Sequence, residues 1–388
     1  MPNEHALLSA SGAARWLKCT KSARLEEQMP ETTSIYAAEG TAAHEFAELA
    51  GKYFTDAISE TEYEAKVEEL SKGEYYTGEM LECAVRYGKY ARERLDTARK
   101  TCPDAYAVFE KRLDFSQWVP SGFGTGDCII VSDGTLEIVD YKYGKGYRVE
   151  AENNPQMKLY ALGALNMVWT LYQVESVRMS IFQPRLSQNA SFHEISVSDL
   201  IDWAETVVAP AATLAWNGSG EFCPCADTCK FCRAGAVCRA RATSNTAISR
   251  ATTEDTLTLE DMGEYLKRAE DLETWLGTLR SAVTQELLAG KTVKGWKLVR
   301  GKSTRKFRSE DEVVEKMTKA GYAEAMLYER KLLTLTRLES DFGKKTLAEV
   351  LGDTIVKPEG SPTLASANDK RPEYVPEDRL VNQLFDNK

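Results

Sequence analysis

The sequence has no uninterrupted apolar stretch that approaches the roughly 20 residues of a membrane-spanning helix, which argues against an integral membrane protein. Its first residues lack the basic-then-apolar order of a secretory signal, so we expect a soluble, cytoplasmic protein without a membrane partner. Basic residues are also outnumbered by acidic ones. The chain has 49 Lys and Arg against 59 Asp and Glu, which gives a formal net charge of −10. This balance argues against a basic coat for nucleic acid, although it leaves room for a local groove or a metal-dependent site.

The remaining composition is ordinary for a globular protein, with 43% hydrophobic and 28% charged residues, and it excludes a fibrous or wholly disordered chain. At roughly 100–200 residues per domain, the 388 residues predict two or three domains. We expect a first module over residues 1–246, a smaller helical and hairpin region over 247–356, and an extended Pro-rich tail over 357–388.

Hydrophobic periodicity predicts a mixed α/β chain. Helices are expected over Ser9–Met29, Tyr36–Phe54, Thr77–Arg99, Pro155–Leu171, Val197–Trp216 and Leu259–Leu288. Strands are expected over residues 105–115 and 126–144, the latter as a hairpin, and over Val177–Gln183 and Ser191–Ile195. The acidic stretch Asp56–Glu79 is expected to be a solvated face or loop.

The hairpin carries the main chemical signal. Asp133 and Gly134 separate two apolar, β-branched runs, a pattern typical of a two-residue turn. If both residues are central in a type I′ turn, facing residues have numbers that sum to 267, and Asp127 faces Asp140. Directly opposed Cβ atoms lie about 4.5–5.5 Å apart, so two carboxylates there repel unless a cation lies between them. This arrangement suits Mg²⁺ or Mn²⁺, which prefer oxygen ligands.

Lys142 projects to the same face as Asp140, because side chains alternate along a strand. Its ammonium could orient an attacking water and stabilise negative charge on a phosphoryl oxygen. The alternative is that Asp127 is a turn residue after Gly126 and that Asp140 and Lys142 are an ordinary exposed pair, since such D-x-K triplets are common by chance.

Three further side chains accompany this hairpin. Gln156 and Tyr160 are four residues apart on the next predicted helix and therefore point from one face. Upstream, His44 lies on a predicted helix in the segment GTAAHEFAEL. Taken singly, each has an ordinary structural explanation. The histidine could be a structural residue whose ring is hydrogen-bonded, and Gln156 and Tyr160 could be part of a partly buried helix surface.

In their order along the chain, these residues resemble the RecB-like branch of the PD-(D/E)xK nuclease superfamily, where a helical His, G-x-x-D, D/E-x-K and Q-x-x-x-Y follow one another. The resemblance implies a restriction-endonuclease-like α/β core with a helical N-terminal part and a metal-dependent nuclease activity. The metal ligands that it implies are His44, Asp127, Asp140 and the carbonyl of Tyr141. Lys142 would position the nucleophile, and Gln156 and Tyr160 would contact the DNA backbone or brace the site. Asp140 stands where many relatives have Glu.

Nine cysteines in a chain expected to be intracellular indicate metal or cluster ligation more than a disulfide framework. Five of the nine are crowded between residues 223 and 238. Local spacing leaves a tetrahedral zinc site open, with four thiolates drawn from Cys223, Cys225, Cys229, Cys232 and Cys238. The remaining candidates for ordinary core positions are Cys83, Cys102 and Cys128.

The C-x2-C-x5-C pattern at residues 229–238 is also similar to that of the AddB-type and CRISPR-associated iron–sulfur nucleases, which have a further cysteine far upstream. This resemblance implies a [4Fe–4S] cluster held by Cys19, Cys229, Cys232 and Cys238. Such a cluster would tie the first helix to the end of the nuclease module. Cys223 and Cys225 depart from the pattern, either as spare thiols or as ligands of the alternative zinc site.

A basic segment over residues 291–308 carries eight positive residues and no acid, with Trp296 and Phe307 interleaved. It is equally well interpreted as a DNA-backbone contact or as a solvated hairpin whose charges balance the acidic helices. The candidate contacts are Lys291, Lys294, Trp296, Lys297, Arg300, Lys302, Arg305, Lys306 and Arg308.

These features together favour a Mg²⁺- or Mn²⁺-dependent DNA exonuclease acting on single- or double-stranded ends. The order of the motifs, followed by a Pro-rich tail, also resembles a phage-encoded group of RecB-like proteins. That resemblance implies a role in phage replication, recombination or repair inside a bacterial host, with a single-strand-binding protein, recombinase or helicase as partner. The alternatives are a catalytically silent DNA-binding accessory protein of the same fold and a zinc-stabilised interaction protein.

Overall fold

The computed structural model describes residues 6–30, 35–247, 258–299 and 310–319, together with residues 343, 345 and 349. The chain divides into two compact units, Met1–Val299 and Arg300–Lys388. In the second unit, helix α12 spans Glu310–Lys319. The sheet, the candidate site and the cysteines all belong to the first unit. The finer domain boundaries expected near residues 247 and 357 remain predictions.

The first unit combines helices with one five-stranded sheet, so the expected mixed α/β class is confirmed. The helices are α1 (Ala13–Trp16), α2 (Ser22–Glu27), α3 (Ile35–Phe54), α4 (Glu60–Leu70), α5 (Gly78–Arg99), α6 (Pro155–Val168), α7 (Val197–Trp203), the π-helical turn η1 (Ala204–Val208), α8 (Ala209–Trp216), α9 (Ala226–Cys229), α10 (Arg239–Thr246) and α11 (Leu259–Leu288). The strands are β1 (Tyr106–Asp114), β2 (Phe123–Val131), β3 (Gly134–Tyr141), β4 (Val174–Phe182) and β5 (Ser191–Ser196). Among the described helices, none combines the length and apolar character that crossing a bilayer requires.

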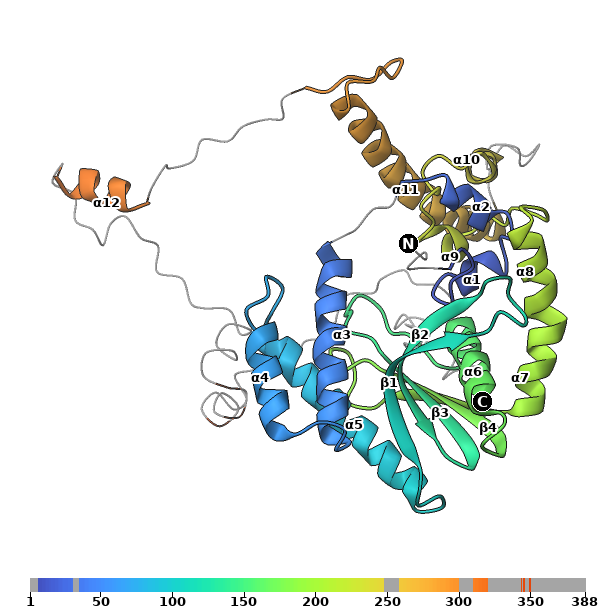
Figure 1. Cartoon of the computed structure of the whole chain (residues 1–388). Coiled ribbons are helices and arrows are strands. Elements are labelled where there is room, and N and C mark those ends of the chain that lie inside the picture. Colours follow the sequence, from blue (N-terminus) through green and yellow to red (C-terminus); the bar gives the residue numbers. More distant parts are fainter. Residues whose placement is uncertain are drawn as a thin grey trace, which may run out of the picture. The chain divides into compact units, whose positions relative to one another are not determined.

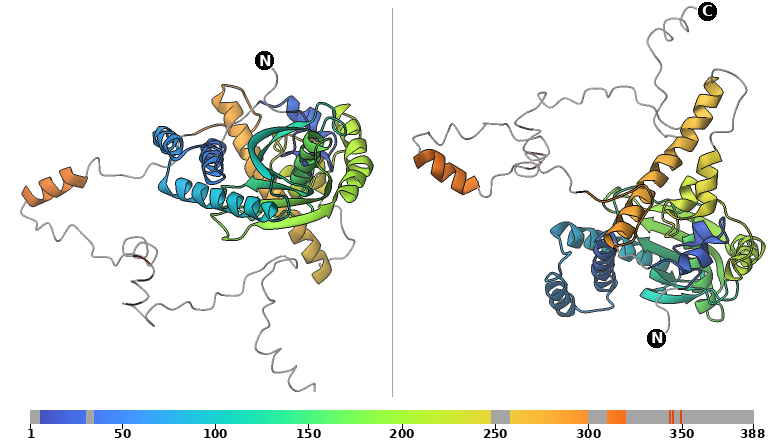
Figure 2. Two further views of the ribbon diagram at one scale, coloured as in Figure 1. Left: turned by 60° about the horizontal axis from the view of Figure 1, so that its bottom comes forward. Right: turned by 90° about the horizontal axis from the view of Figure 1, so that it is seen from above.

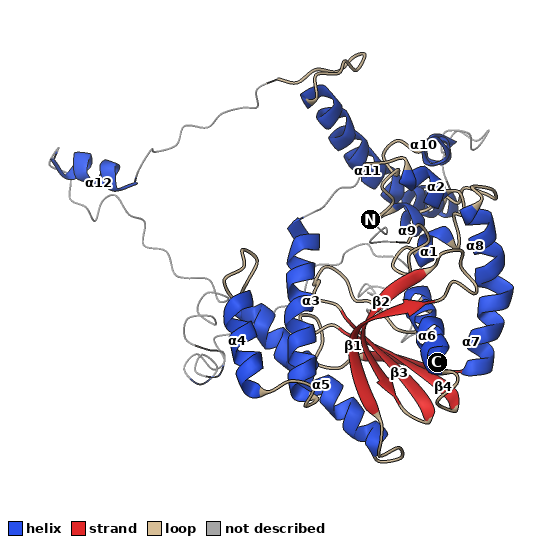
Figure 3. Ribbon diagram, in the orientation of Figure 1, coloured by secondary structure: helices blue, strands red, loops and turns tan. Residues whose placement is uncertain are grey.

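The five strands lie in the order in which they occur along the chain (Figure 1). Strands β1, β2 and β3 form an antiparallel meander, and β5 pairs antiparallel with β4 at the other edge. Strands β3 and β4 are parallel, so the chain must cross over between them, and α6 makes that crossover (Figure 3). The crossover brings the first turn of α6 beside the end of β3, where the Lys142 ammonium donates to the Gln156 amide oxygen.

Helices cover both faces of the sheet, and each face has its own apolar core (Figure 2). Because side chains alternate along a strand, β2 contributes to both cores. Ile129 and Val131 pack in the core that contains α6, whereas Cys128 and Ile130 pack in the core that contains α3 and α5. The alternation holds the backbone of β2 rigidly between two packed layers.

A buried acid tethers β3 to α5 on the second of these faces. The carboxylate of Glu137 accepts hydrogen bonds from Arg94 at 2.9 and 3.0 Å and from the Ser180 hydroxyl at 2.9 Å. Arg178 lies 3.5 Å from the same carboxylate. Burial raises the pKa of Glu137, and the two guanidinium groups oppose that shift.

The register expected for the β2–β3 hairpin is confirmed. The paired residues are Cys128 with Val139, Ile129 with Ile138 and Ile130 with Glu137, and each pair sums to 267. The turn itself differs from the expected type I′ geometry, which needs positive φ at both central residues. Gly134 has φ of +79°, but Asp133 is not among the residues with positive φ. The Asp133 side chain instead accepts a hydrogen bond from the Gln173 N–H at 3.0 Å, so the turn is fixed by the loop before β4.

Three helical expectations are also corrected or refined. The helix expected over Ser9–Met29 is divided into α1 and α2 by a turn that contains Cys19. The helix expected over Val197–Trp216 is continuous but contains η1, because Pro210 has no N–H for an α-helical bond to the preceding turn. The acidic stretch contains α4, none of whose residues is buried, in agreement with the expected solvated face.

Candidate active site and cysteine cluster

The structure brings together residues from four separate elements, around the middle of β2 and the carboxyl end of β3. The expected site residues are His44 on α3, Asp127 on β2, Asp140 and Tyr141 on β3, Lys142 directly after β3, and Gln156 and Tyr160 on α6. Asn154 caps α6 by accepting hydrogen bonds from the N–H groups of Gln156 and Met157. Helix α6 therefore begins at a fixed point beside the end of β3, which orients Gln156 towards the carboxylates.

Asp140 and Lys142 form a buried ion pair. The Lys142 Nζ lies 3.0 Å from Asp140 Oδ2, and the Asp140 side chain is only 3% exposed. Lys142 also donates to the Oε1 of Gln156 at 3.4 Å, while the Gln156 amide donates to Asp140 Oδ1 at 3.4 Å and to the Tyr160 hydroxyl at 3.2 Å. Burial disfavours the ammonium, but the charges of Asp140 and Asp127 outweigh it and raise the pKa of Lys142. The lysine is thus held as a cation by its neighbours.

Asp127 connects this pair to α3. Its Oδ2 accepts a hydrogen bond from the backbone N–H of Tyr141 at 2.6 Å, and its Oδ1 lies 3.3 Å from the Nδ1 of His44. The His44 ring also stands edge-on to the Tyr141 ring, with centroids 5.5 Å apart. Burial disfavours the imidazolium, but the Asp127 carboxylate outweighs this and raises the pKa of His44. One Asp127 oxygen is therefore fixed by the backbone while the other faces the imidazole.

The sequence analysis missed Glu110, which also belongs to this site. In the β1–β2 register Phe109 pairs with Cys128 and Lys111 with Gly126, so Glu110 falls opposite Asp127. Its φ of +47° takes it out of the ladder. His44, Glu110 and Asp127 each offer one ligand atom, and these atoms lie within 4.8 Å of one another. Glu110 is exposed at the surface, but its partial desolvation beside the other site residues, followed by the charge of Asp127, raises its pKa to about 7.

The donor set fits an oxygen-preferring divalent cation. Three carboxylates, Glu110, Asp127 and Asp140, gather beside one imidazole, and crowded negative charges of this kind call for a positive ion between them. The buried Oδ2 of Asp140 accepts no hydrogen bond, although it lies next to the Lys142 ammonium. An acceptor left without a donor in the interior is costly unless another cation completes its environment.

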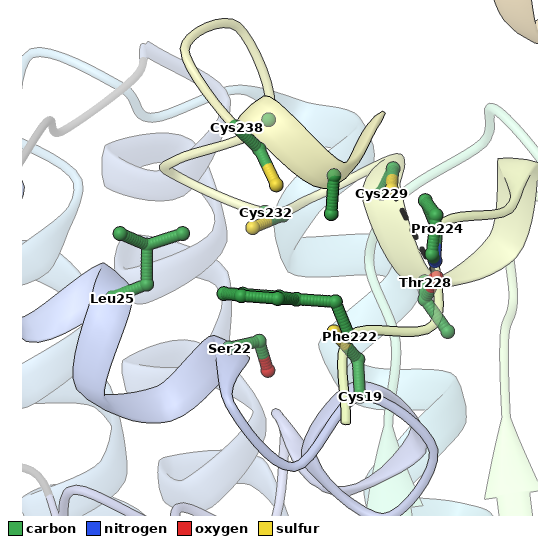
Figure 4. A pocket seen from close by; sticks show the side chains of 11 residues that line it. Cys19, Ser22, Leu25, Phe222, Pro224, Thr228, Cys229, Cys232 and Cys238 are labelled. Atoms are coloured by element: carbon green, nitrogen blue, oxygen red, sulfur yellow. Dashed lines mark hydrogen bonds between the residues drawn. The ribbon is translucent and has the colours of Figure 1, made fainter. Parts of the chain in front are cut away.

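The four cysteines expected to hold a cluster line one pocket. Cys19, Cys229, Cys232 and Cys238 surround it together with apolar side chains that include Leu25 and Phe222 (Figure 4). Cys223 and Cys225 are exposed and are not among the lining residues. The remaining three cysteines, Cys83, Cys102 and Cys128, are buried in the core beside α3 and α5.

Polar contacts join the N-terminal helices to the cysteine loop across about two hundred residues of sequence. Arg15 on α1 pairs with Glu26 on α2 at 2.7 Å, and Glu26 accepts the backbone N–H of Arg233 at 2.8 Å. The N–H of Cys223 donates to the Cys19 sulfur at 3.3 Å. Burial, assisted by the charge of Glu26, raises the pKa of the Cys232 thiol to about 12. Without a metal the Cys232 thiol is therefore neutral, so its binding to a metal must release a proton.

The basic segment is only partly described. Val293 and Trp296 form an isolated bridge around a tight turn with Gly295 at φ +84°. Lys291 pairs with Glu286 at 2.5 Å, and Trp296 is exposed. The further described candidates in this segment are Lys294 and Lys297. Outside the described residues lie Arg300, Lys302, Arg305, Lys306 and Arg308, and also the tail over 357–388.

Comparison with solved structures gives distant similarities. A protein of Eubacterium rectale named "Putative exonuclease" matches with 12% identity and a TM-score of 0.31, over 66% of this chain and 92% of that one. The alkaline exonuclease LHK-Exo of Laribacter hongkongensis matches with 14% identity and a TM-score of 0.24, over 53% and 91%. LHK-Exo in complex with dAMP gives 14% identity and a TM-score of 0.24, over 46% and 93%. All three scores lie below 0.5, so the interpretation of the site rests on its own geometry.

The family of the chain is established by sequence. Residues 5–372 match the family described as "Protein of unknown function (DUF2800)", which is most of the 388-residue chain. The chain belongs to this family.

Proposed function

We propose that this member of the DUF2800 family is a divalent-metal-dependent DNA exonuclease of the PD-(D/E)xK type, which hydrolyses phosphodiester bonds at DNA ends. The observation that carries the proposal is the ion pair of Lys142 with Asp140 at the carboxyl end of β3, in which 3.0 Å separates the ammonium from Asp140 Oδ2 and the charge of Asp127 acts on the same ammonium. Carboxylates, an imidazole and a held ammonium in one place are the groups that metal-assisted phosphodiester hydrolysis needs.

His44, Glu110, Asp127 and Asp140 are the residues that would hold the cation, Mg²⁺ or Mn²⁺, with the Tyr141 carbonyl as a further ligand. When bound, such a cation supplies positive charge that polarises a phosphoryl oxygen and makes a water molecule a stronger acid. Glu110 enters this set from the structure, and the other ligands come from the sequence motif.

Lys142 acts as a cation in this proposal. Its ammonium is fixed by Asp140 and by the Gln156 amide oxygen, so its remaining donor can orient a water molecule and stabilise negative charge on a phosphoryl oxygen. Gln156 and Tyr160 brace it, because the Gln156 amide bonds both Asp140 and the Tyr160 hydroxyl. The site is thus organised before substrate arrives, which lowers the cost of reaching the transition state.

We also propose that Cys19, Cys229, Cys232 and Cys238 hold a [4Fe–4S] cluster with a structural role. Their shared pocket, from which Cys223 and Cys225 are absent, supports this ligand set over a local zinc site. A cluster there would reinforce the contacts that already join α1 and α2 to the cysteine loop. Brown, iron-containing protein is the expected result, and colourless protein with stoichiometric zinc would contradict it.

The cellular role is proposed on the order of the motifs. We infer a function in phage-type DNA replication, recombination or repair in the cytoplasm of a bacterial host. A single-strand-binding protein, a recombinase or a helicase would be the natural partner, since each works on or produces DNA ends. The basic segment that begins at Lys291 is proposed as an additional DNA contact.

The decisive experiment is degradation of end-labelled linear single- and double-stranded DNA by anaerobically purified protein, with Mg²⁺ or Mn²⁺. Asp140→Asn is expected to lose cleavage, because it removes the charge that faces both the cation and Lys142. Asp114→Asn is the matched control, since Asp114 is an exposed acid at the end of β1. Tight DNA binding without cleavage by the unaltered protein would instead support the accessory-protein alternative.

A further inference from the structure

Two large aromatic rings lie exposed against each other near the proposed active site. Tyr147 is 53% and Phe231 is 61% exposed, and their rings stack with centroids 6.1 Å apart and planes inclined by 29°. Tyr147 lies in the loop that follows Lys142, and Phe231 lies between Cys229 and Cys232. Exposed aromatic side chains gathered from distant segments are unusual on a surface without a binding role.

A cation accompanies this pair. The Lys230 ammonium lies 4.5 Å from the centroid of the Tyr147 ring and 5.4 Å from that of the Phe231 ring. The combination of π faces with a positive charge beside them matches the two parts of a nucleotide, because bases stack on aromatic rings and phosphates attract ammonium groups.

The backbone beneath Tyr147 is fixed from the interior. Gln183, which is buried and follows β4, donates from Nε2 to the Gly144 carbonyl at 2.6 Å and to the Tyr147 carbonyl at 3.0 Å. Its Oε1 accepts the N–H of Val149 at 3.1 Å. One buried side chain thus holds three backbone points of an otherwise exposed loop, which restrains the backbone that carries the Tyr147 side chain.

The backbone beneath Phe231 is fixed as well. Arg15 donates from Nη1 to the Phe231 carbonyl at 3.2 Å, and the same guanidinium pairs with Glu26 at 2.7 Å. Glu26 also accepts the N–H of Arg233, two residues further along the loop. Both rings are therefore solvent-facing side chains on backbones that polar contacts restrain, an arrangement suited to receiving a planar partner.

The pair also lies close to the proposed site of cleavage. Tyr147 follows Lys142 by five positions, and a fully extended chain of that length spans at most about 18 Å. A strand with its end at Asp140 and Lys142 can therefore reach the aromatic pair within a few nucleotides.

We propose that Tyr147, Phe231 and Lys230 form a stacking platform that binds unpaired bases of single-stranded DNA and guides that strand to Asp140 and Lys142. The inference rests on the proposed nuclease function and names its substrate form. It requires single strands because bases inside a duplex offer no free face to a protein ring. Gln183 is a positioning residue in this scheme, since it acts through the loop that carries Tyr147.

The test measures binding of the full-length protein to oligonucleotides that contain 2-aminopurine, a base whose fluorescence changes on stacking. The Asp140→Asn background prevents cleavage during the titration. Tyr147→Ala and Phe231→Ala are each expected to weaken single-strand binding about 5- to 150-fold, the equivalent of about 1–3 kcal/mol for one stacked base. Tyr147→Phe should restore binding, and affinity for a blunt duplex should change less than about twofold in every variant.

Trp169→Ala is the matched control, because Trp169 is 61% exposed, as Phe231 is, and caps the end of α6 opposite to Gln156. Iron content and visible absorption verify that Phe231→Ala retains the cysteine loop, and Tyr147→Ala tests the platform independently of that loop. Unchanged single-strand affinity and unchanged fluorescence in Tyr147→Ala would overturn the platform.

The two proposals fail separately. If protein with Asp140 intact cleaves DNA while the Tyr147 and Phe231 variants in the silenced background bind single strands normally, the platform is wrong and the nuclease stands. If single-strand binding depends on both rings but no cleavage occurs with Mg²⁺ or Mn²⁺, the nuclease is wrong and the platform stands.

Discussion

Replacing Lys142 with Met should destabilise the metal-free protein, because it leaves the buried Asp140 carboxylate without its counter-charge. Asp140 is 3% exposed, and the Lys142 ammonium lies 3.0 Å from its Oδ2. Removing one partner of a buried ion pair costs about 3–5 kcal/mol. Lys142 is 27% exposed, so water reaches its side of the pair, and we expect the lower end of this range, about 3 kcal/mol.

Thermal unfolding followed by circular dichroism provides the measurement. At roughly 2–4 °C per kcal/mol for a domain of this size class, the Lys142→Met melting temperature should fall by about 6–12 °C in metal-free buffer. Lys145→Met, which removes an exposed lysine from the same loop, should change stability by no more than about 0.5 kcal/mol. Asp140→Asn combined with Lys142→Met removes both charges and should recover most of the loss.

Divalent cations should reverse the effect, because a bound ion supplies the missing positive charge. Mn²⁺ at 100 times its Kd stabilises a folded protein by about 2.7 kcal/mol, which nearly equals the expected loss. Melting of Lys142→Met within about 1 °C of the unaltered protein in metal-free buffer would refute the reasoning. It would mean that burial alone keeps Asp140 neutral and that the ion pair contributes nothing.

Three further outcomes are expected. Glu110→Gln should raise the Kd for Mn²⁺ at least about 10-fold in calorimetric titrations, because it removes one carboxylate from the ligand group, whereas Lys111→Gln on the same strand should not. Cys19→Ser should lose iron and melt at lower temperature, whereas Cys83→Ser, in a core cysteine, should keep its iron; equal iron in both would exclude Cys19 as a ligand. Glu137→Ala should cost about 3–5 kcal/mol in denaturant unfolding by leaving the Arg94 guanidinium unpaired and Arg178 with only Glu194, and a loss under about 1 kcal/mol would contradict the tether.

The sequence predicts the β2–β3 register because a short hairpin leaves few ways to pair its strands. Asp127 and Asp140 were placed together by counting from the turn, and the count of 267 holds even though the turn is not type I′. Register depends on burying the alternating apolar residues, and a shift by one residue would send Ile129 and Ile138 to the wrong core. The hydrophobic pattern therefore preserves the site geometry while Asp133 bonds elsewhere.

Glu110 was missed because nothing local fixes the pairing of β1 with β2. Residues 115–122 form an eight-residue connection rather than a two-residue hairpin turn, so no count from a turn could place Glu110 opposite Asp127. Its positive φ is also invisible in a strand-like run. The break between α1 and α2 has a similar origin, since the contacts of Cys19 and Glu26 with residues near 230 are tertiary and have no periodic signal.

The separation of the four pocket cysteines has a consequence for how the protein is made. Cys238 follows Cys19 by 219 residues, so at about 5–20 residues per second a ribosome adds it about 10–45 s after Cys19. All of the proposed catalytic residues, up to Tyr160, are synthesised within that interval. Until the cysteine loop emerges, Arg15 and Glu26 have no partner from residues 231–233. The nascent chain therefore carries its complete set of catalytic side chains before its N-terminal helices can be secured.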